Sequence, residues 1–400
     1  MPLYHIRYMN STGEVQEGTE RADSPAEIAQ RLREKEQYPI DVKRVMSFTS
    51  LNIHLFSRIK MKDIAVFCRQ FHTMLASGVT IVNCLEILRQ EEEKNRFRKV
   101  IDGLYEDVQK GNTFSEALEK YTDVFPPLMI YMVAAGETAG SLDTVMSRLA
   151  IHYEKEYKIT NKIISAFVYP IILTVIAIAA ILFMLTVVLP TFLAMFEESG
   201  VPLPAPTLIV MAISDSLRSN WIIYTAGVAA FFYLVRLYIS TPGGRYRLDS
   251  LKMRLPLFRR LNRKIVSSRF ARTMATMLTS GVPLIQSLEN VAGALGNTMV
   301  EKKILSTREE IRKGIAISVP IRKVGVFPHI LVSMIKIGEE SGTLDIILDR
   351  TADFYDEEVE TEVQRMLTFL EPIMIIFMGL IVGFVVISMV LPLFDVYQTI

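Results

Sequence analysis

The stretch FCRQFHTMLASGV at residues 67–79 occurs again as FARTMATMLTSGV at residues 270–282, and this pair decides the fold. The same shift of 202 to 203 residues pairs other short motifs along the chain. The matched motifs are Lys110-Gly111 with Lys313-Gly314, Phe125-Pro126 with Phe327-Pro328, GETAGSLD with GEESGTLD, Pro170 with Pro372, and Leu189-Pro190 with Leu391-Pro392. The period is too long for a solenoid. We therefore interpret it as a duplication in which each copy is a domain with its own core.

Three apolar segments predict membrane-spanning helices. Half of the 400 residues are hydrophobic and the mean hydropathy is +0.30, which is high for a soluble protein of this size. Segments 169–193 and 372–394 each hold the roughly 20 apolar residues that cross a bilayer. Segment 221–240 is a weaker candidate because it contains Arg236, although this residue lies near the end, where its side chain can reach the interface.

The positions of lysine and arginine predict the orientation of these spans. Basic residues precede the first span and cluster after the second, the loop between them is acidic, and no Lys or Arg follows Arg365. The positive-inside rule therefore places the N-terminus in the cytoplasm and the C-terminus outside. The N-terminal residues lack a basic stretch followed by an apolar core, so we expect no cleavable signal peptide.

The predicted fold class is a mainly α integral membrane protein with two homologous six-helix cytoplasmic bundles, three transmembrane helices and a small N-terminal α+β module. The expected parts are a module at 1–46, a linker at 47–62, a first bundle at 63–168, a transmembrane helix at 169–193, a periplasmic loop at 194–220, a transmembrane helix at 221–240, a basic segment and second bundle at 241–371, a transmembrane helix at 372–394 and a periplasmic tail at 395–400.

Helix signals in the first copy agree with a bundle. Asp63 is expected to cap the first helix, Thr113 and Glu116 have the spacing of a capping box, and Pro127 suits a first helical turn. A sixth helix that starts near Ser141 can continue unbroken into the membrane.

The first 45 residues follow a different pattern, which predicts the α+β module. Tyr4, Ile6 and Tyr8 alternate as in a strand, and residues 10–13 are typical of a turn. Residues 24–27, with the sequence SPAE, combine the cap, proline and acid that open a helix.

The sequence contains no catalytic motif that we could identify. It lacks a GxxxxGK[ST] phosphate loop, an HExxH pair, a GxSxG elbow and a Cys/His cluster. Cys68 and Cys84 are interpreted as core residues, and His72 and His152 as satisfied structural residues. We therefore expect no catalytic, cofactor-binding or metal-binding residues, and nothing in the net charge of +1 indicates nucleic acid.

The duplicated motif GE-x-x-G-x-LD allows two interpretations. Its residues are Gly136, Glu137, Gly140 and Asp143 in the first copy and Gly338, Glu339, Gly342 and Asp345 in the second. As a functional site, the four carboxylates would bind a metal or a proton. As a structural motif, the second glycine ends a helix in the left-handed conformation, Ser141 or Thr343 caps the next helix, and the aspartate meets its positive end. The structural interpretation is favoured, but it leaves both glutamates free to fix the turn or to face a partner.

Two further features concern the membrane helices. Pro170 and Pro372 occupy matched positions at the boundary between the predicted bundle and the predicted span. We expect them to bend the helix in both copies. Gly379 and Gly383 form a GxxxG motif that permits close packing with another helix.

Two charged runs also allow two interpretations each. The acidic run at 356–362 is interpreted as a solvated helix face, with a basic partner as the alternative. The basic cluster at 245–269 follows from topology, with a cytoplasmic partner or acidic lipid as the lesser alternative.

With these motifs in view, the chain resembles the inner-membrane platform proteins of type II secretion and type IV pilus machines, the GspF/PilC family. The resemblance is carried by the paired segments quoted first, the paired GE-x-x-G-x-LD motifs, FYDEEVETEV at 354–363 and VLPLF at 390–394. It implies a non-enzymatic scaffold in the bacterial inner membrane. The implied partners are a hexameric cytoplasmic assembly ATPase, pilin or pseudopilin subunits, other inner-membrane assembly proteins and membrane lipid.

Two other classes of protein compete with this interpretation. A repeat-built transporter would place polar or broken helices at the membrane midplane, whereas the first and third spans carry no charge there. A membrane enzyme would use the duplicated glutamates and aspartates. The sequence does not decide between pilus and secretion use, and it is compatible with a homo-oligomer.

Overall fold

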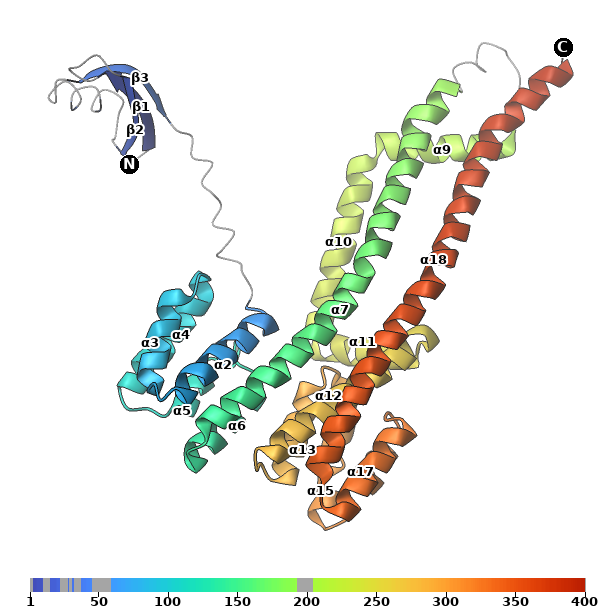
Figure 1. Cartoon of the computed structure of the whole chain (residues 1–400). Coiled ribbons are helices and arrows are strands. Elements are labelled where there is room, and N and C mark those ends of the chain that lie inside the picture. The colour runs from blue at the N-terminus through green and yellow to red at the C-terminus, as the bar shows by residue number, and fades with distance from the viewer. Residues whose placement is uncertain are drawn as a thin grey trace. The chain divides into compact units, whose positions relative to one another are not determined.

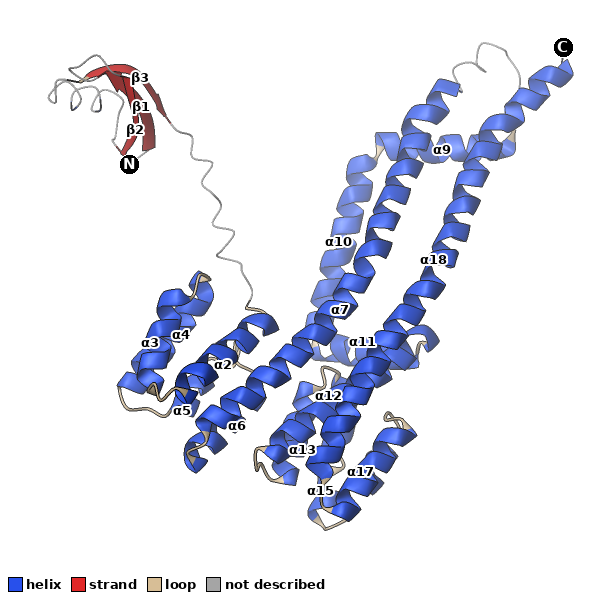
Figure 2. Cartoon of the chain, viewed as in Figure 1, coloured by secondary structure: helices blue, strands red, loops and turns tan. Residues whose placement is uncertain are grey.

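The computed structural model describes residues 3–9, 15–21, 28, 31, 37–44, 59–192 and 204–399. The described part is almost entirely helical apart from three strands (Figure 2). The chain divides into two compact units, which we describe separately. One consists of Met1–Ile59 with Arg89–Ile101, and the other of Lys60–Leu88 with Asp102–Ile400.

The first unit contains a three-stranded antiparallel sheet. Its strands are β1 (Leu3–Met9), β2 (Val15–Arg21) and β3 (Tyr38–Arg44), in the order β2-β1-β3. The predicted alternation at 4–8 falls on β1, which pairs with both neighbours. The predicted turn at 10–13, nearly all of the helix predicted from residue 24 and most of the linker at 47–62 lie outside the described residues.

The helices of the first copy follow residue 60. They are α2 (Met61–Ala76), α3 (Ile81–Glu91), α4 (Asn95–Gln109), α5 (Phe114–Glu119), α6 (Pro127–Ala139) and α7 (Leu142–Phe183). The prediction for Asp63 was wrong, because the extended residue Lys60 is the N-cap and Asp63 lies three residues into α2. Its carboxylate accepts a hydrogen bond of 2.8 Å from the Lys60 amide, as the acid of a capping box does. Helix α2 therefore starts inside the predicted linker.

Other helix starts in the first copy are those that the sequence predicts. Thr113 and Glu116 form a reciprocal capping box at α5, and Pro127 occupies the first turn of α6. The core between these helices is aromatic. The Phe71 ring stacks on Phe114 at 5.0 Å between centroids, and the Phe67 ring lies 5.5 Å from Phe71.

The second copy repeats this plan with one break. Its helices are α12 (Pro256–Thr279), α13 (Leu284–Ala294), α14 (Thr298–Leu305), α15 (Arg308–Arg312), α16 (Ser318–Val324), α17 (His329–Ser341) and α18 (Leu344–Thr399). Helices α14 and α15 together match α4. Phe67 and Phe125 lie 5.8 Å apart in the first copy, and their counterparts Phe270 and Phe327 lie 4.9 Å apart. The duplication therefore extends to ring packing.

Among the described residues, three helices are long and apolar enough to cross a membrane: Leu142–Phe192, α10 (Trp221–Ser240) and Leu344–Leu391. The first holds 51 residues and the last 48, whereas a bilayer needs roughly 20. Both therefore extend well beyond the span. Figure 1 shows α7 and α18 each as one continuous helix that extends beyond the other helices of its own copy. Helix α11 (Pro242–Arg254) connects α10 to α12.

The segment expected as a loop between the first two spans contains a helix, α9 (Ala205–Ser219). Proline in its first turn and buried positions at Thr207, Val210 and Ser214 explain its formation. Helix α9 contacts both α18 and a short π-helix, η2 (Met184–Val188), which follows α7. The Ser214 hydroxyl donates a 2.6 Å hydrogen bond to the Leu185 carbonyl of η2. The Thr207 hydroxyl donates to the Ser388 carbonyl of α18.

Candidate functional site at the junction of the two copies

The duplicated glutamates cap a helix of their own copy. Glu137 accepts hydrogen bonds from the amides of Phe114 and Ser115, at 2.6 and 3.0 Å, at the start of α5. Glu339 accepts from Ile317 and Ser318, at 2.8 and 3.4 Å, at the start of α16. A carboxylate at a helix N-terminus satisfies free amides and meets the positive end of the dipole. This geometry accounts for the glutamates that the sequence left open.

In each copy one glycine of the motif ends a helix, and the other lies where two helices are in close contact. Gly140 ends α6 with φ of 65° and Gly342 ends α17 with φ of 69°, the left-handed conformation that glycine adopts most easily. A Cβ at Gly136 would lie 2.8 Å from a Val145 methyl carbon, and one at Gly338 would lie 2.9 Å from the Leu344 Cα. These two glycines let α6 and α17 approach the following long helix.

The remaining motif residues lie just after the helix ends at Gly140 and Gly342. Asp143 and Asp345 lie in the first turns of α7 and α18. Ser141 is the N-cap residue of α7, as predicted, but the expected side-chain cap is not formed, because its hydroxyl makes no cap hydrogen bond. Its ψ of 35° departs from the extended backbone that an N-cap side chain requires. Within the described residues no three His, Cys, Asp or Glu side chains could hold a metal ion.

The residues predicted to act in the membrane lie within α7 and α18. Pro170 is buried inside α7 and Pro372 is exposed inside α18, and both helices continue through them. A Cβ added to Gly379 or Gly383 would meet no atom of the described chain within 4 Å. No described helix therefore packs closely against these two glycines, and their proposed packing partner stays a prediction.

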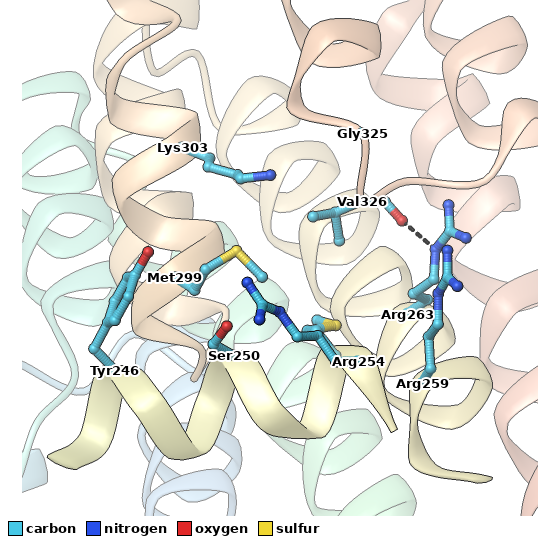
Figure 3. A pocket seen from close by; sticks show the side chains of 10 residues that line it. Tyr246, Ser250, Arg254, Arg259, Arg263, Met299, Lys303, Gly325 and Val326 are labelled. Atoms are coloured by element: carbon cyan, nitrogen blue, oxygen red, sulfur yellow. Dashed lines mark hydrogen bonds between the residues drawn. The ribbon is translucent and has the colours of Figure 1, made fainter. Parts of the chain in front are cut away.

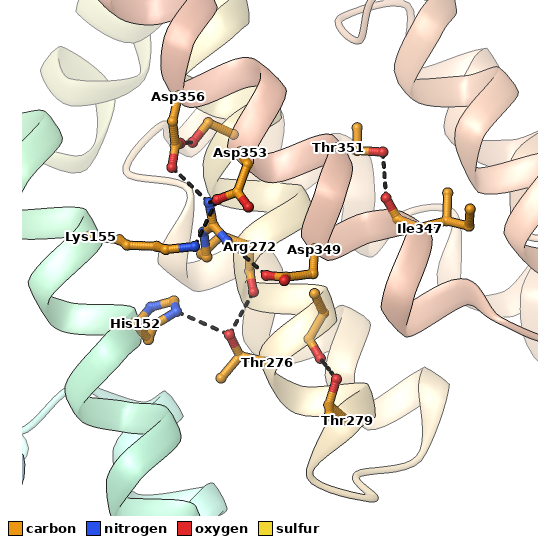
Figure 4. A network of polar contacts seen from close by, with 12 residues as sticks. His152, Lys155, Arg272, Thr276, Thr279, Ile347, Asp349, Thr351, Asp353 and Asp356 are labelled. Carbon is orange, nitrogen blue, oxygen red and sulfur yellow. Dashed lines mark hydrogen bonds and ion pairs between the residues drawn. The ribbon is translucent and has the colours of Figure 1, made fainter.

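The two copies meet at a charged network around Arg272 of α12 (Figure 4). Its guanidinium donates to three carboxylates of α18: Asp349 at 2.7 Å, Asp353 at 2.6 Å and Asp356 at 2.7 Å. The Arg272 side chain is only 7% exposed. Although burial lowers the pKa of Arg272, Asp356 and Asp353 raise it more, so the guanidinium stays charged.

Lysines of α7 connect the first copy to this network. Lys155 forms a 2.7 Å ion pair with Asp353. Lys162 pairs with Glu360, seven residues further along each helix. From α12, Lys264 contacts Glu358 at 2.8 Å and Glu362 at 2.7 Å. The interpretation of the acidic run as a solvated face is therefore wrong for Asp356 and Glu362, whose side chains are 17% and 8% exposed, whereas the Glu360 side chain is 45% exposed. Its partners are basic side chains of the same chain.

A cavity of about 270 Å³ lies beside the network, between α7 and α12. It is lined by His152 and Glu156 of α7 and by Arg269 and Arg272 of α12. His152 is buried, and its Nδ1 lies 3.3 Å from the Thr276 hydroxyl. Burial, with the charges of Arg272 and Arg269, lowers the pKa of His152 to about 3. Burial raises the pKa of Glu156, while Arg269 at 3.5 Å acts in the opposite direction.

An apolar cluster joins the same three helices nearer to the spans. Leu261 of α12 is buried against Val359, Val363 and Met366 of α18. Partly buried side chains of α7 pack on this cluster, among them Ile159 and Ile163. The junction thus combines ion pairs, which fix the register of the helices, with apolar packing.

The junction was not predicted from the sequence, although two signals were present. Arg69 and Arg272 occupy the same position in the two quoted stretches, so a paired role was visible. Asp349, Asp353 and Asp356 have the i, i+4, i+7 spacing of one helix face. Neither signal identified Lys155 as the partner from the other copy.

Comparison with known proteins agrees with the repeat. The family model described as type II secretion system (T2SS), protein F matches twice, at residues 67–190 and 270–392. The model of the N-terminal domain of type II secretion system protein F matches residues 1–43.

Curated relatives align over nearly the whole chain. The type IV pilus assembly protein PilC of Thermus thermophilus is 37% identical over 403 residues, which is 100% of this chain and 99% of the relative. PilC of Myxococcus xanthus is 35% identical, over 96% of this chain and 92% of the relative. The type II secretion system protein F of Vibrio cholerae is 30% identical, over 99% and 98%. The chain therefore belongs to the type II secretion system protein F family, which includes the PilC proteins of type IV pilus assembly.

Proposed function

We propose that this chain is the inner-membrane platform of a type IV pilus or type II secretion machine. In that role it couples a cytoplasmic assembly ATPase to the insertion of pilin or pseudopilin subunits into a fibre. The energy comes from the partner ATPase, and the chain itself catalyses no reaction. The names of the relatives support a place in such an assembly.

The observation that carries this proposal is the continuity of α7 and α18. Each starts at the GE-x-x-G-x-LD motif of its copy and runs without a break into an apolar span. A rigid helix transmits a displacement along its axis, and the Arg272 network with Lys155 ties the two helices together. A force on either copy would therefore reach both spans.

The proposed organisation keeps the expected parts. The α+β module and the two six-helix bundles lie in the cytoplasm, residues 194–220 and the C-terminus lie in the periplasm, and spans at 169–193, 221–240 and 372–394 make a multi-pass inner-membrane protein. The basic residues around 245–269 support this orientation. Gly379 and Gly383 are the proposed contact in a homo-oligomer, and other inner-membrane assembly proteins are further partners.

Identity supports pilus assembly as the first choice between the two machines. The two PilC relatives are 37% and 35% identical, whereas the Vibrio cholerae secretion protein is 30% identical. Each of these alignments covers more than nine-tenths of both chains.

A helix-breaking test addresses the coupling directly. Ile164 of α7 and Phe369 of α18 are 62% and 67% exposed, so substitution there removes little packing. Ile164→Pro and Phe369→Pro should each abolish surface fibres in cells and leave copurification of the ATPase unchanged, because proline interrupts the helix without touching the bundle surface.

Ile164→Ala and Phe369→Ala are the matched controls and should assemble fibres normally. Fibre assembly by both proline variants at the wild-type level would refute coupling through these helices. Loss of ATPase copurification by a proline variant that melts at the wild-type temperature would also refute it.

A further inference from the structure

A second cavity, of about 440 Å³, opens among α11, α12 and α14 (Figure 3). Tyr246, Ser250 and Arg254 project into it from one face of α11, at the four-residue spacing that aligns side chains along a helix. Its volume is within the range of small-molecule sites.

Four cationic side chains line this cavity, and no carboxylate does. They are Arg254, Arg259, Arg263 and Lys303. Asp249, the acidic residue of α11, is buried and occupied elsewhere: it accepts hydrogen bonds from Thr298 at 3.0 and 3.1 Å and lies 3.3 Å from Lys252. The cavity is therefore a site of uncompensated positive charge.

Two of the four cations have a structural role and two do not. Arg263 donates to the Val326 carbonyl, and Lys303 donates to the Val324 carbonyl at 3.0 Å, so both hold the end of α16. Within the described part of the chain, the side chains of Arg254 and Arg259 form no ion pair or hydrogen bond. Burial, followed by the charge of Arg259, lowers the pKa of Arg263, as expected for like charges that share a site.

The neighbouring surface indicates where an anion would come from. Helix α11 begins two residues after the second candidate span ends at Ser240. Leu251, Leu255 and Phe258 are exposed by 49%, 41% and 40% next to the two free arginines. Exposed apolar side chains beside arginines are typical of a segment that lies in the membrane interface.

We infer that this cavity binds the phosphate of an anionic phospholipid headgroup from the cytoplasmic leaflet, held by Arg254 and Arg259. Guanidinium groups match phosphate oxygens with paired hydrogen bonds, and a headgroup at this depth leaves its acyl chains in the bilayer. The inference rests on the orientation proposed above. Free phosphate has the same chemistry, so the source has to be tested.

The test uses the full chain purified in detergent, with phosphatidylglycerol, phosphatidylcholine or inorganic phosphate added. Phosphatidylglycerol should raise the melting temperature of the wild type and remain bound in native mass spectrometry, whereas phosphatidylcholine and inorganic phosphate should do neither. Arg254→Gln with Arg259→Gln should weaken phosphatidylglycerol binding about tenfold or more, because charge-assisted hydrogen bonds are lost.

The control is Arg245→Gln with Arg260→Gln, which removes the same charge from the same region outside the cavity lining. It should bind as the wild type does. Equal binding by both double variants would overturn the site, and stabilisation by inorganic phosphate alone would overturn the lipid source. The assay requires neither ATPase nor fibres, so its failure is distinguishable from failure of the proposed function.

Discussion

The two copies use one arginine in two ways. In the first copy, Arg69 forms a bidentate pair with Glu154 at 2.7 and 2.9 Å, and these side chains are 43% and 46% exposed. In the second copy, the matched Arg272 pairs with the matched Asp356, but its side chain is 7% exposed and it also holds Asp349 and Asp353. The repeated pair is thus a surface ion pair in one copy and the centre of the junction in the other.

Both copies contain the pair at matched positions, and the surroundings decide its energetic weight. An exposed pair gains little because water competes for both charges, whereas removing one partner of a buried group leaves the other uncompensated. Two carboxylates and the contact from Lys155 are present around the arginine of the second copy alone. The junction was therefore built from a motif that both copies share.

Replacement of the matched arginines tests this comparison with the largest expected effect. Arg272→Ala should destabilise the protein by about 3 kcal/mol, because Asp356 keeps only its hydrogen bond from Ser268. Arg69→Ala should cost about 0.5 kcal/mol. Melting temperatures of the two variants in the same detergent measure the contrast. Equal shifts would show that burial does not set the weight of the pair.

For the capping glutamates, substitution should destabilise the protein more in the first copy than in the second, which is the reverse of the order expected for the arginines. Glu137→Gln and Glu339→Gln each exchange charged for neutral acceptors, at a cost of about 1 kcal/mol. The cost should be greater at Glu137, whose hydrogen bonds to amides are shorter than those of Glu339. Melting temperature and hydrogen exchange of the peptide containing Phe114 and Ser115 provide the measurements. A greater loss for Glu339→Gln contradicts this ranking.

The smallest expected effect concerns pH and His152, whose counterpart is Phe354. Both rings lie edge-on to a tyrosine, His152 at 5.1 Å from Tyr153 and Phe354 at 5.3 Å from Tyr355. The pKa of His152 is about 3 in the folded chain, below its ordinary 6.5. Its neutral form therefore favours folding above pH 6.5, and this contribution is lost as pH falls from about 6.5 toward 3.

Between pH 7.5 and 6 the loss should be about 0.8 kcal/mol in the wild type. It should be absent in His152→Phe, so the melting temperature of the variant should fall less over this interval. Arg272, Arg269 and Glu156 face this ring and stay the same in both proteins. Parallel pH profiles for the two proteins would rule out a neutral buried histidine.

Sequence predicted what is local or repeated, and missed what depends on the meeting of distant surfaces. Capping signals at Thr113 and Pro127 predicted helix starts because the interactions lie within a few residues. The three spans followed from apolar length. The Arg272 network was not predicted, because the i, i+4, i+7 spacing of its three aspartates identifies one face of a helix but not the helix that packs against it. Helix α9 was missed because proline in a short connection suggests a loop, while its stability comes from burial against η2 and α18.

Helix α9 has a mechanical consequence. Its hydroxyls fasten η2 to α18 at one end of the two long helices, and the Arg272 network fastens α7 to α18 near the other. Because α7 with η2 is joined to α18 near both ends, the two long helices resist moving apart and deform most easily by shear, in which both tilt together. A displacement applied to one helix near the Arg272 network would therefore tilt both helices and move their opposite ends sideways.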